Sequence, residues 1–130
     1  MCGIAGWACP APSRLRELPD LLERAAGALR HRGPDAEGFF FDAVCDVALA
    51  HRRLSIIDLS DAANQPMKLE SAALTLIFNG EIYNYRELRN ELKVRGCRFR
   101  SQADPETLLH AWFEWGPSWS ASEYALSARL

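Results

Sequence analysis

Apolar residues recur at helical spacing in three segments of the chain. The first segment, residues 19–30, alternates leucines and alanines with charged residues and has a proline in its first turn, as an amphipathic helix does. The second covers residues 85–96 and closes on a glycine, the residue that commonly follows a helix. The third covers residues 104–116 and opens with Asp-Pro-Glu. We therefore predict three helices.

Short apolar or aromatic runs predict strands before and between these helices. They lie at residues 3–8, 39–41, 47–50, 54–57 and 74–78. The first and last of them are expected to be buried, and the second and third to form a hairpin. Because strands and helices mix without strict alternation, we predict an α+β fold rather than a doubly wound parallel sheet. Residues after Gly116 support no prediction of secondary structure.

The composition, with 48% hydrophobic and 25% charged residues in a chain of 130, is that of one globular domain. Fifteen Lys and Arg against seventeen Asp and Glu give a net charge of −2, which argues against a nucleic-acid partner. No apolar run approaches the roughly 18 residues that a membrane span requires, and the N-terminus lacks the features of a signal peptide. The sequence therefore favours a cytoplasmic protein with no membrane partner.

The cysteines and histidines give no sign of a metal site. Four cysteines, at positions 2, 9, 45 and 97, include no Cys-x-x-Cys pair, and the three histidines show no zinc-site spacing. Cys9, Cys45 and Cys97 are expected to be reduced and to pack like small hydrophobic residues. The large aromatic residues are likewise expected in the core: the phenylalanines at 39–41, Trp112 and Trp115.

Cys2 stands apart because of its position. Removal of the initiator Met1, common before a small residue, would leave Cys2 with a free α-amine whose unperturbed pKa of roughly 7.7–8.0 suits a general base. One residue would then hold both nucleophile and base, so neither His31 nor His51 is needed for catalysis. Gly3 would let a substrate approach the backbone. The alternative, on position alone, is that Cys2 is merely the second residue.

Cys2 belongs to the first of five motifs that follow one another along the chain. They are Met-Cys-Gly-Ile-Ala-Gly at 1–6, His-Arg-Gly-Pro-Asp at 31–35, His-Arg-Arg-Leu-Ser-Ile-Ile-Asp at 51–58, Asn-Gln-Pro-Met at 64–67 and Phe-Asn-Gly-Glu-Ile-Tyr-Asn at 78–84. In this order they resemble the glutaminase domain of glutamine-hydrolysing asparagine synthetase, a class II (N-terminal nucleophile) glutamine amidotransferase. The resemblance covers residues 1–116 and favours Cys2 as the nucleophile.

The resemblance implies an N-terminal-nucleophile αββα sandwich, incomplete at its C-terminus, that hydrolyses glutamine to glutamate and ammonia. The Cys2 thiolate would attack the side-chain amide, and water would release glutamate from the thioester. This half needs no cofactor. Ammonia would pass to a synthetase domain or subunit that amidates aspartate with ATP and Mg²⁺, and the present sequence has no Ser-Gly-Gly-Leu-Asp-Ser loop or other nucleotide motif.

The resemblance also assigns the other site residues. Asn79 and Gly80 would donate hydrogen bonds to the oxyanion of the tetrahedral intermediate. Arg53 would bind the α-carboxylate of glutamine, because a guanidinium matches a carboxylate in shape and charge. Asp104 and Glu81 are the candidates for its α-ammonium group, and we prefer Asp104.

Each of these residues also has an ordinary structural interpretation. Asn79-Gly80 fits a type I′ hairpin turn after a strand. Arg53 fits a solvated surface arginine, as its neighbour Arg52 is expected to be. Asp104 fits the N-cap of the helix that follows it.

Residues 117–130 depart from the family pattern. We therefore divide the chain into a partial glutamine amidotransferase type 2 domain at 1–116 and a divergent tail, for which a single-base shift near codon 116 is our hypothesis. Two alternatives stay open. The chain can be an inactive truncated fragment, or the glutaminase domain of another class II amidotransferase, as in phosphoribosylamine or glucosamine phosphate synthesis.

Overall fold

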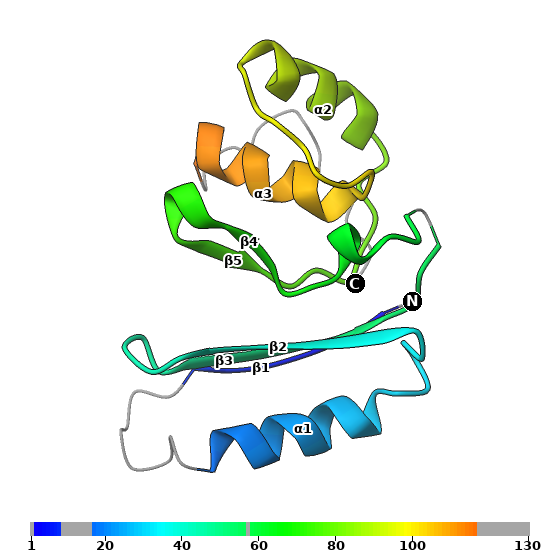
Figure 1. Cartoon of the computed structure of the whole chain (residues 1–130), viewed down its shortest axis with the longest axis vertical. Coiled ribbons are helices and arrows are strands. Elements are labelled where there is room, and N and C mark those ends of the chain that lie inside the picture. Colours follow the sequence, from blue (N-terminus) through cyan, green and yellow to red (C-terminus); the bar gives the residue numbers. More distant parts are fainter. Residues whose placement is uncertain (1, 9–16, 57, 117–130) are drawn as a thin grey trace. The chain divides into compact units, whose positions relative to one another are not determined.

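The computed structural model of the chain describes residues 2–8, 17–56 and 58–116. These residues fall into two compact units, whose elements are labelled in Figure 1. The first unit runs to Ile56 and also takes in Asn64–Pro66 and Ile77–Asn79. The second unit holds the chain between those segments and everything described from Gly80 onward. Two short segments therefore return to the first unit after the chain has left it.

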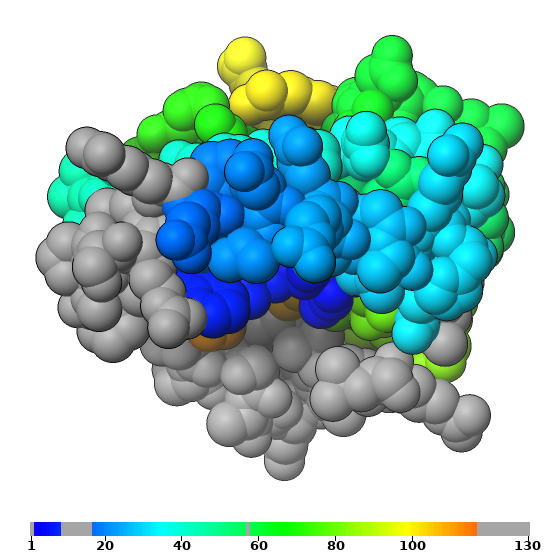
Figure 2. Space-filling view, turned by 90° about the horizontal axis from the view of Figure 1, so that it is seen from below, coloured from blue at the N-terminus to red at the C-terminus, as the bar shows by residue number. Residues whose placement is uncertain are grey.

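A three-stranded antiparallel sheet is the centre of the first unit. Its strands lie in the order β1 (Gly3–Ala8), β3 (Val47–Arg53) and β2 (Ala36–Asp42). Helix α1 (Leu18–Ala28) packs along one face of this sheet (Figure 1). Seen from the helix side, α1 lies across the unit with part of β1 visible beside it (Figure 2).

Small residues on the sheet let α1 pack closely. The core consists of apolar residues from the helix and the two strands that it contacts: Leu18, Leu22, Ala26, Ala48, Ala50 and Ala5. Successive side chains of a strand point to opposite faces, so Arg52 shares the α1 face with the two alanines of β3. His51 and Arg53 therefore lie on the opposite face. The strand β3 thus presents two neighbouring arginines to different surroundings.

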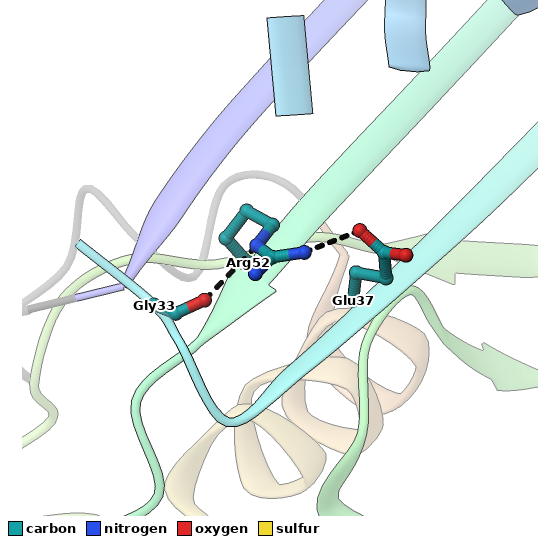
Figure 3. Close-up of polar contacts among 3 residues, drawn as sticks. All are labelled: Gly33, Glu37 and Arg52. Carbon is teal, nitrogen blue, oxygen red and sulfur yellow. Dashed lines mark hydrogen bonds and ion pairs between the residues drawn. The ribbon is translucent and has the colours of Figure 1, made fainter. Parts of the chain in front are cut away.

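Arg52 is buried on the α1 face, and our expectation of a solvated arginine is wrong. Its Nε donates to the Gly33 carbonyl oxygen at 2.9 Å, and its Nη1 pairs with the Glu37 carboxylate (Figure 3). A Cβ atom on Gly33 would lie 2.3 Å from the Arg52 carbonyl carbon, so only glycine allows this approach. The arginine thereby fastens the loop after α1 to the end of β3.

The same loop holds the chain beyond β3. The Asp35 N–H donates to the Arg53 carbonyl oxygen at 3.0 Å, and the Asp35 carboxylate accepts from the Ser55 N–H at 2.7 Å. These two bonds lie on either side of Leu54. The motif at 31–35 is therefore a support for residues 53–55.

The second unit contains a short hairpin and two helices. Strands β4 (Met67–Leu69) and β5 (Leu74–Leu76) pair antiparallel. Helices α2 (Tyr85–Val94) and α3 (Asp104–Trp115) pack against each other, and α3 also contacts both strands (Figure 1). Two 3₁₀ turns complete the unit, at Asp61–Ala63 and Glu70–Ala72.

The three helices and two antiparallel sheets of the described residues are those of the α+β class. The predicted helices and the hairpin of β2 and β3 are confirmed, while β4 was absent from the prediction. The strand predicted at 74–78 ends at Leu76. The strand predicted at 54–57 is wrong for residues 54–56, which have no strand conformation, and residue 57 lies outside the described residues.

Several apolar residues expected in the core are exposed instead. Strands β1 and β2 are the edges of the sheet, and α1 contacts β3 and β1, so bulky side chains on these edges stay in part uncovered. The residues concerned on these strands, each 36–46% exposed, are Ile4, Trp7, Phe39 and Phe41. Trp112, on α3 in the second unit, is 42% exposed as well. Trp115 is half-buried.

Two cysteines differ in their packing. Cys45 lies exposed in the turn between β2 and β3, so its expected place in the core is wrong, and Cys97 is half-buried. Cys9 lies outside the described residues. Among the helices of the described residues, none has the length and apolar character needed to cross a membrane.

Candidate active site

Cys2 lies directly before β1, beside the end of β3. Gly3 pairs with Arg52 in the sheet, so Cys2 comes next to the residues that follow β3. Its Sγ accepts a hydrogen bond from the Leu54 N–H at 3.3 Å and lies 3.8 Å from the Leu54 carbonyl oxygen. The sulfur is thus held by the backbone of the residue after β3. Met1 lies outside the described residues.

Gly3 lies against the turn that follows α1. A Cβ atom here would lie 2.9 Å from the Cβ of Leu29, just past the end of α1. The absence of a side chain therefore serves the packing of that turn on the sheet. The expected approach of a substrate to the backbone at Gly3 stays a prediction.

Arg53 is buried on the sheet face opposite α1, with 7% of its surface exposed. Its Nη1 donates to Asn64 Oδ1 at 2.6 Å. The interpretation of Arg53 as a solvated arginine is therefore wrong. Because Cys2 is held by Leu54, the next residue, the structure brings the predicted nucleophile and the predicted carboxylate ligand together in the first unit.

Asn79 belongs to the same unit, as the last residue of the segment Ile77–Asn79 that follows β5. The preceding residue is fixed by Gln65, whose Oε1 accepts from the Phe78 N–H at 2.6 Å and whose Nε2 donates to the Phe78 carbonyl oxygen at 3.3 Å. Gln65 adjoins Asn64, the partner of Arg53. One segment of the chain therefore contacts both the arginine and the residue before Asn79.

The hairpin interpretation of Asn79-Gly80 is wrong. A type I′ turn requires positive φ at both central residues, and the described residues with positive φ are elsewhere: Asp46, Ala73, Gly96 and Gly116. Strand β5 pairs with β4, which precedes it, and α2 is the next element after Gly80. The backbone of Asn79 and Gly80 therefore does not form a type I′ turn.

Gly80, Glu81 and Asp104 lie in the second unit. Asp104 is buried, and its Oδ2 accepts from the Ile82 N–H at 3.1 Å. Burial raises the pKa of Asp104, and the nearby carboxylate of Glu81 acts in the same direction. The structure therefore brings both candidates for the α-ammonium ligand together, with Glu81 exposed and Asp104 buried.

The N-cap interpretation of Asp104 is wrong by one residue. Ala103 occupies the N-cap, and Asp104 is the first residue of α3. The start of this helix is instead held by Glu106, whose carboxylate accepts from the backbone N–H groups of Arg100 and Ser101 at 2.7 and 2.8 Å. The Asp104 carboxylate is therefore not used for capping.

The two histidines differ in their surroundings. His31 is exposed and its Nδ1 donates to the Ala28 carbonyl oxygen at 2.9 Å. His51 is 1% exposed, on the same face as Arg53, and neither ring nitrogen has a hydrogen-bond partner among the described residues. Burial lowers the pKa of His51 to about 4, so the ring is neutral at pH 7.

This burial predicts a pH-dependent stability. The ordinary pKa of 6.5 applies in the unfolded chain, so acid protonates the unfolded state first. The free energy of unfolding should therefore fall as the pH drops from about 6.5 to about 4, by up to about 3 kcal/mol from His51. A His51→Leu variant should lack this part of the decline in denaturant titrations at pH 7 and 4.5. An exposed-site control, His31→Leu, should keep it, and parallel pH profiles for all three proteins would contradict the assignment.

Comparison with known proteins identifies a family. Residues 1–124 match the family model described as a glutamine amidotransferase domain. The glutamine-hydrolyzing asparagine synthetase 1 of Bacillus subtilis is 41% identical over 110 residues, which are 84% of this chain and 17% of the relative. Asparagine synthetase 3 of the same organism is 36% identical over 117 residues, or 88% of this chain and 18% of the relative.

A plant protein gives the same result. The glutamine-hydrolyzing asparagine synthetase 1 of Arabidopsis thaliana is 38% identical over 117 residues, or 89% of this chain and 19% of the relative. The chain thus spans less than a fifth of the length of these three relatives. The family model matches almost the whole chain, including the cysteine at position 2. The chain therefore belongs to the glutamine amidotransferase domain family.

Proposed function

We propose that the chain is the glutaminase part of a glutamine-hydrolysing asparagine synthetase. It hydrolyses the side-chain amide of glutamine and supplies ammonia to a synthetase domain or subunit, where aspartate is amidated. The observation that carries the proposal is the position of Cys2, whose sulfur accepts from the Leu54 N–H beside the buried Arg53. Nucleophile and carboxylate ligand are thereby neighbours.

The reaction begins after removal of Met1. The α-amine of Cys2 takes the thiol proton, and the thiolate attacks the amide carbon of glutamine. The oxyanion that forms accepts hydrogen bonds from the side chain of Asn79 and the N–H of Gly80. The carbon–nitrogen bond then breaks, and the departing nitrogen takes the proton from the Cys2 ammonium group and leaves as ammonia.

The second half of the reaction releases glutamate. The thioester on Cys2 is attacked by water, which loses a proton to the free α-amine. Collapse of the second tetrahedral intermediate frees glutamate and returns the proton to the sulfur. The same amine thus acts as base and then as acid in each half of the reaction.

Substrate binding uses charges at the other end of glutamine. Arg53 binds the α-carboxylate, with its guanidinium oriented by Asn64. Asp104 binds the α-ammonium group in preference to Glu81. The Ile82 N–H supports the Asp104 carboxylate in this role, because it fixes one of the two carboxylate oxygens.

The fold, location and partners follow the family pattern in this proposal. We assign the domain to the αββα sandwich of N-terminal nucleophile hydrolases and expect it in the cytoplasm. ATP and Mg²⁺ would act in the synthetase part. The described residues bring together no group of three or more His, Cys, Asp or Glu side chains suited to a metal ion.

The role of Arg53 predicts a specific kinetic defect. Arg53→Ala should raise KM for glutamine about 10–100-fold, the loss expected for a hydrogen-bonded charge pair. It should change kcat much less, because the carboxylate contact is the same in the ground state and the transition state. Steady-state assays of glutamate release measure both constants.

A matched control is Arg24→Ala, since Arg24 is exposed on α1. This variant should leave both constants unchanged. If Arg53→Ala lowered kcat and left KM at its original value, Arg53 would not be the carboxylate ligand.

A further inference from the structure

The segment Asn64–Pro66 is an unusual part of the first unit. The chain on both sides of it belongs to the second unit, so these three residues form a separate return to the first unit, as Ile77–Asn79 do further along the chain. Gln65 is buried, yet its side chain is polar and makes two hydrogen bonds. Burial of a side-chain amide is favourable only when its polar groups are hydrogen-bonded. The two hydrogen bonds of Gln65 therefore fix the position of this segment.

Gln65 binds both backbone polar groups of Phe78, which belong to the peptide bonds on either side of that residue. It accepts from the N–H of Phe78 and donates to its carbonyl oxygen, at 2.6 and 3.3 Å. That carbonyl is part of the planar peptide bond that joins Phe78 to Asn79. Fixing the carbonyl oxygen therefore fixes the plane from which Asn79 projects.

Asn64 holds a different group. Its Oδ1 accepts from Nη1 of Arg53 at 2.6 Å. A guanidinium binds a carboxylate well only when its plane is oriented, and an acceptor at one nitrogen restricts that orientation. The adjacent residues Asn64 and Gln65 thus contact two separate parts of the proposed site.

The segment rests on a rigid element. A Cβ atom at Gly38, in the middle of β2, would lie 2.1 Å from the Gln65 carbonyl oxygen and 3.0 Å from its carbonyl carbon. The backbone of Gln65 is therefore packed directly on the sheet at a glycine, on the face that also carries Arg53. Sites held on strands are more precise than sites held on loops.

We propose that Asn64 and Gln65 are positioning residues with separate effects. Asn64 orients Arg53 and so controls binding of glutamine, while Gln65 orients Asn79 and so controls stabilisation of the oxyanion. This inference rests on the proposed function. It predicts that two neighbours in the sequence give different kinetic defects.

The test uses near-isosteric apolar replacements in the full chain. Asn64→Leu should raise KM for glutamine about tenfold with kcat changed less than about twofold, the effect of one hydrogen bond to a charged group. Gln65→Met should lower kcat about tenfold with KM changed less than about threefold, because the oxyanion donor is displaced. Asn90→Leu and Gln102→Met, at exposed positions, are the controls and should change neither constant.

A second measurement does not depend on activity. The Phe78 N–H donates to Gln65 Oε1, so Gln65→Met should speed hydrogen exchange of the Phe78 amide by about tenfold relative to the unsubstituted chain. Asn64→Leu should leave that exchange rate unchanged.

The outcomes separate the two proposals. Equal changes of KM and kcat in both variants, or unchanged Phe78 exchange in Gln65→Met, would overturn the positioning roles and leave the glutaminase intact. An unsubstituted chain that hydrolyses no glutamine, yet shows the predicted exchange, would overturn the proposed function and with it the kinetic part of this inference. A KM defect in Asn64→Leu and a kcat defect in Gln65→Met, together with faster Phe78 exchange in Gln65→Met, would support both the proposed function and the positioning roles.

Discussion

Asn79→Ala should lower kcat for glutamine hydrolysis by about 10²–10³, the loss expected when one donor of an oxyanion hole is removed. The side-chain amide of Asn79 is proposed to bind charge that exists only in the tetrahedral intermediate. Binding of glutamine itself should therefore change little, and KM should stay within about threefold. Steady-state kinetics with a coupled assay for glutamate measure both constants.

The matched control is Asn90→Ala on the exposed side of α2, which should behave as the unsubstituted chain. Thermal unfolding of Asn79→Ala should also be unchanged. A defect confined to KM would contradict the oxyanion role and would instead place Asn79 in ground-state binding.

Two glycine-to-alanine changes should have opposite effects on stability. Gly38→Ala places a methyl group 2.1 Å from the Gln65 carbonyl oxygen, and neither β2 nor the packed backbone of Gln65 can yield easily. We expect a loss of about 3 kcal/mol or more in the free energy of unfolding, at the upper end of overpacking effects. Because Gln65 must shift, kcat should fall as well.

Gly27→Ala is the control for this prediction. Gly27 lies in α1, and a Cβ atom there would meet nothing within 4 Å. Alanine should therefore stabilise the chain by about 0.5–1 kcal/mol, since it is the better helix former. Denaturant titrations of the two variants and the unsubstituted chain measure these changes in the free energy of unfolding. Equal stability of Gly38→Ala and the unsubstituted chain would contradict the close packing of Gln65 on β2.

Helices and the central hairpin were predictable because their pattern repeats over many residues. The leucines and alanines of α1 recur over three turns, and the prediction differs from the observed Leu18–Ala28 by one or two residues at each end. Strand β4 has three residues, too few to show a period of two, and was missed, whereas β5 was predicted too long, because the apolar run continues past Leu76. Short strands depend on their partner, which a local pattern does not reveal.

The strand predicted at 54–57 is absent from residues 54–56 for a clear physical reason. The run is mostly apolar, but at residues 54–56, the described part, the N–H groups of Leu54 and Ser55 bond to side chains and not to a neighbouring strand. The Leu54 N–H donates to Cys2 Sγ, and the Ser55 N–H donates to Asp35 Oδ2. The segment therefore serves the site, and its local pattern conflicts with the structure where function requires it.

The site was predicted only in part. The family resemblance assigns Cys2, Arg53 and Asn79, and the structure places all three in the first unit. The residues that hold them, such as Gln65, could not be found by pattern, because a glutamine in a polar loop gives no signal of burial. The opposite faces of Arg52 and Arg53 follow from strand alternation, but the burial of both depends on partners that are distant in sequence.

The most direct test of the account is chemical labelling of Cys2. The chain is treated with an electrophilic analogue of glutamine and examined by intact mass and peptide mapping, with glutamine as competitor and Cys2→Ala as control. We predict that Met1 is absent, that one label is attached to Cys2, and that glutamine protects it, because a free N-terminal cysteine beside Arg53 is the proposed nucleophile. Retention of Met1, or label chiefly on Cys9, Cys45 or Cys97, would contradict the account.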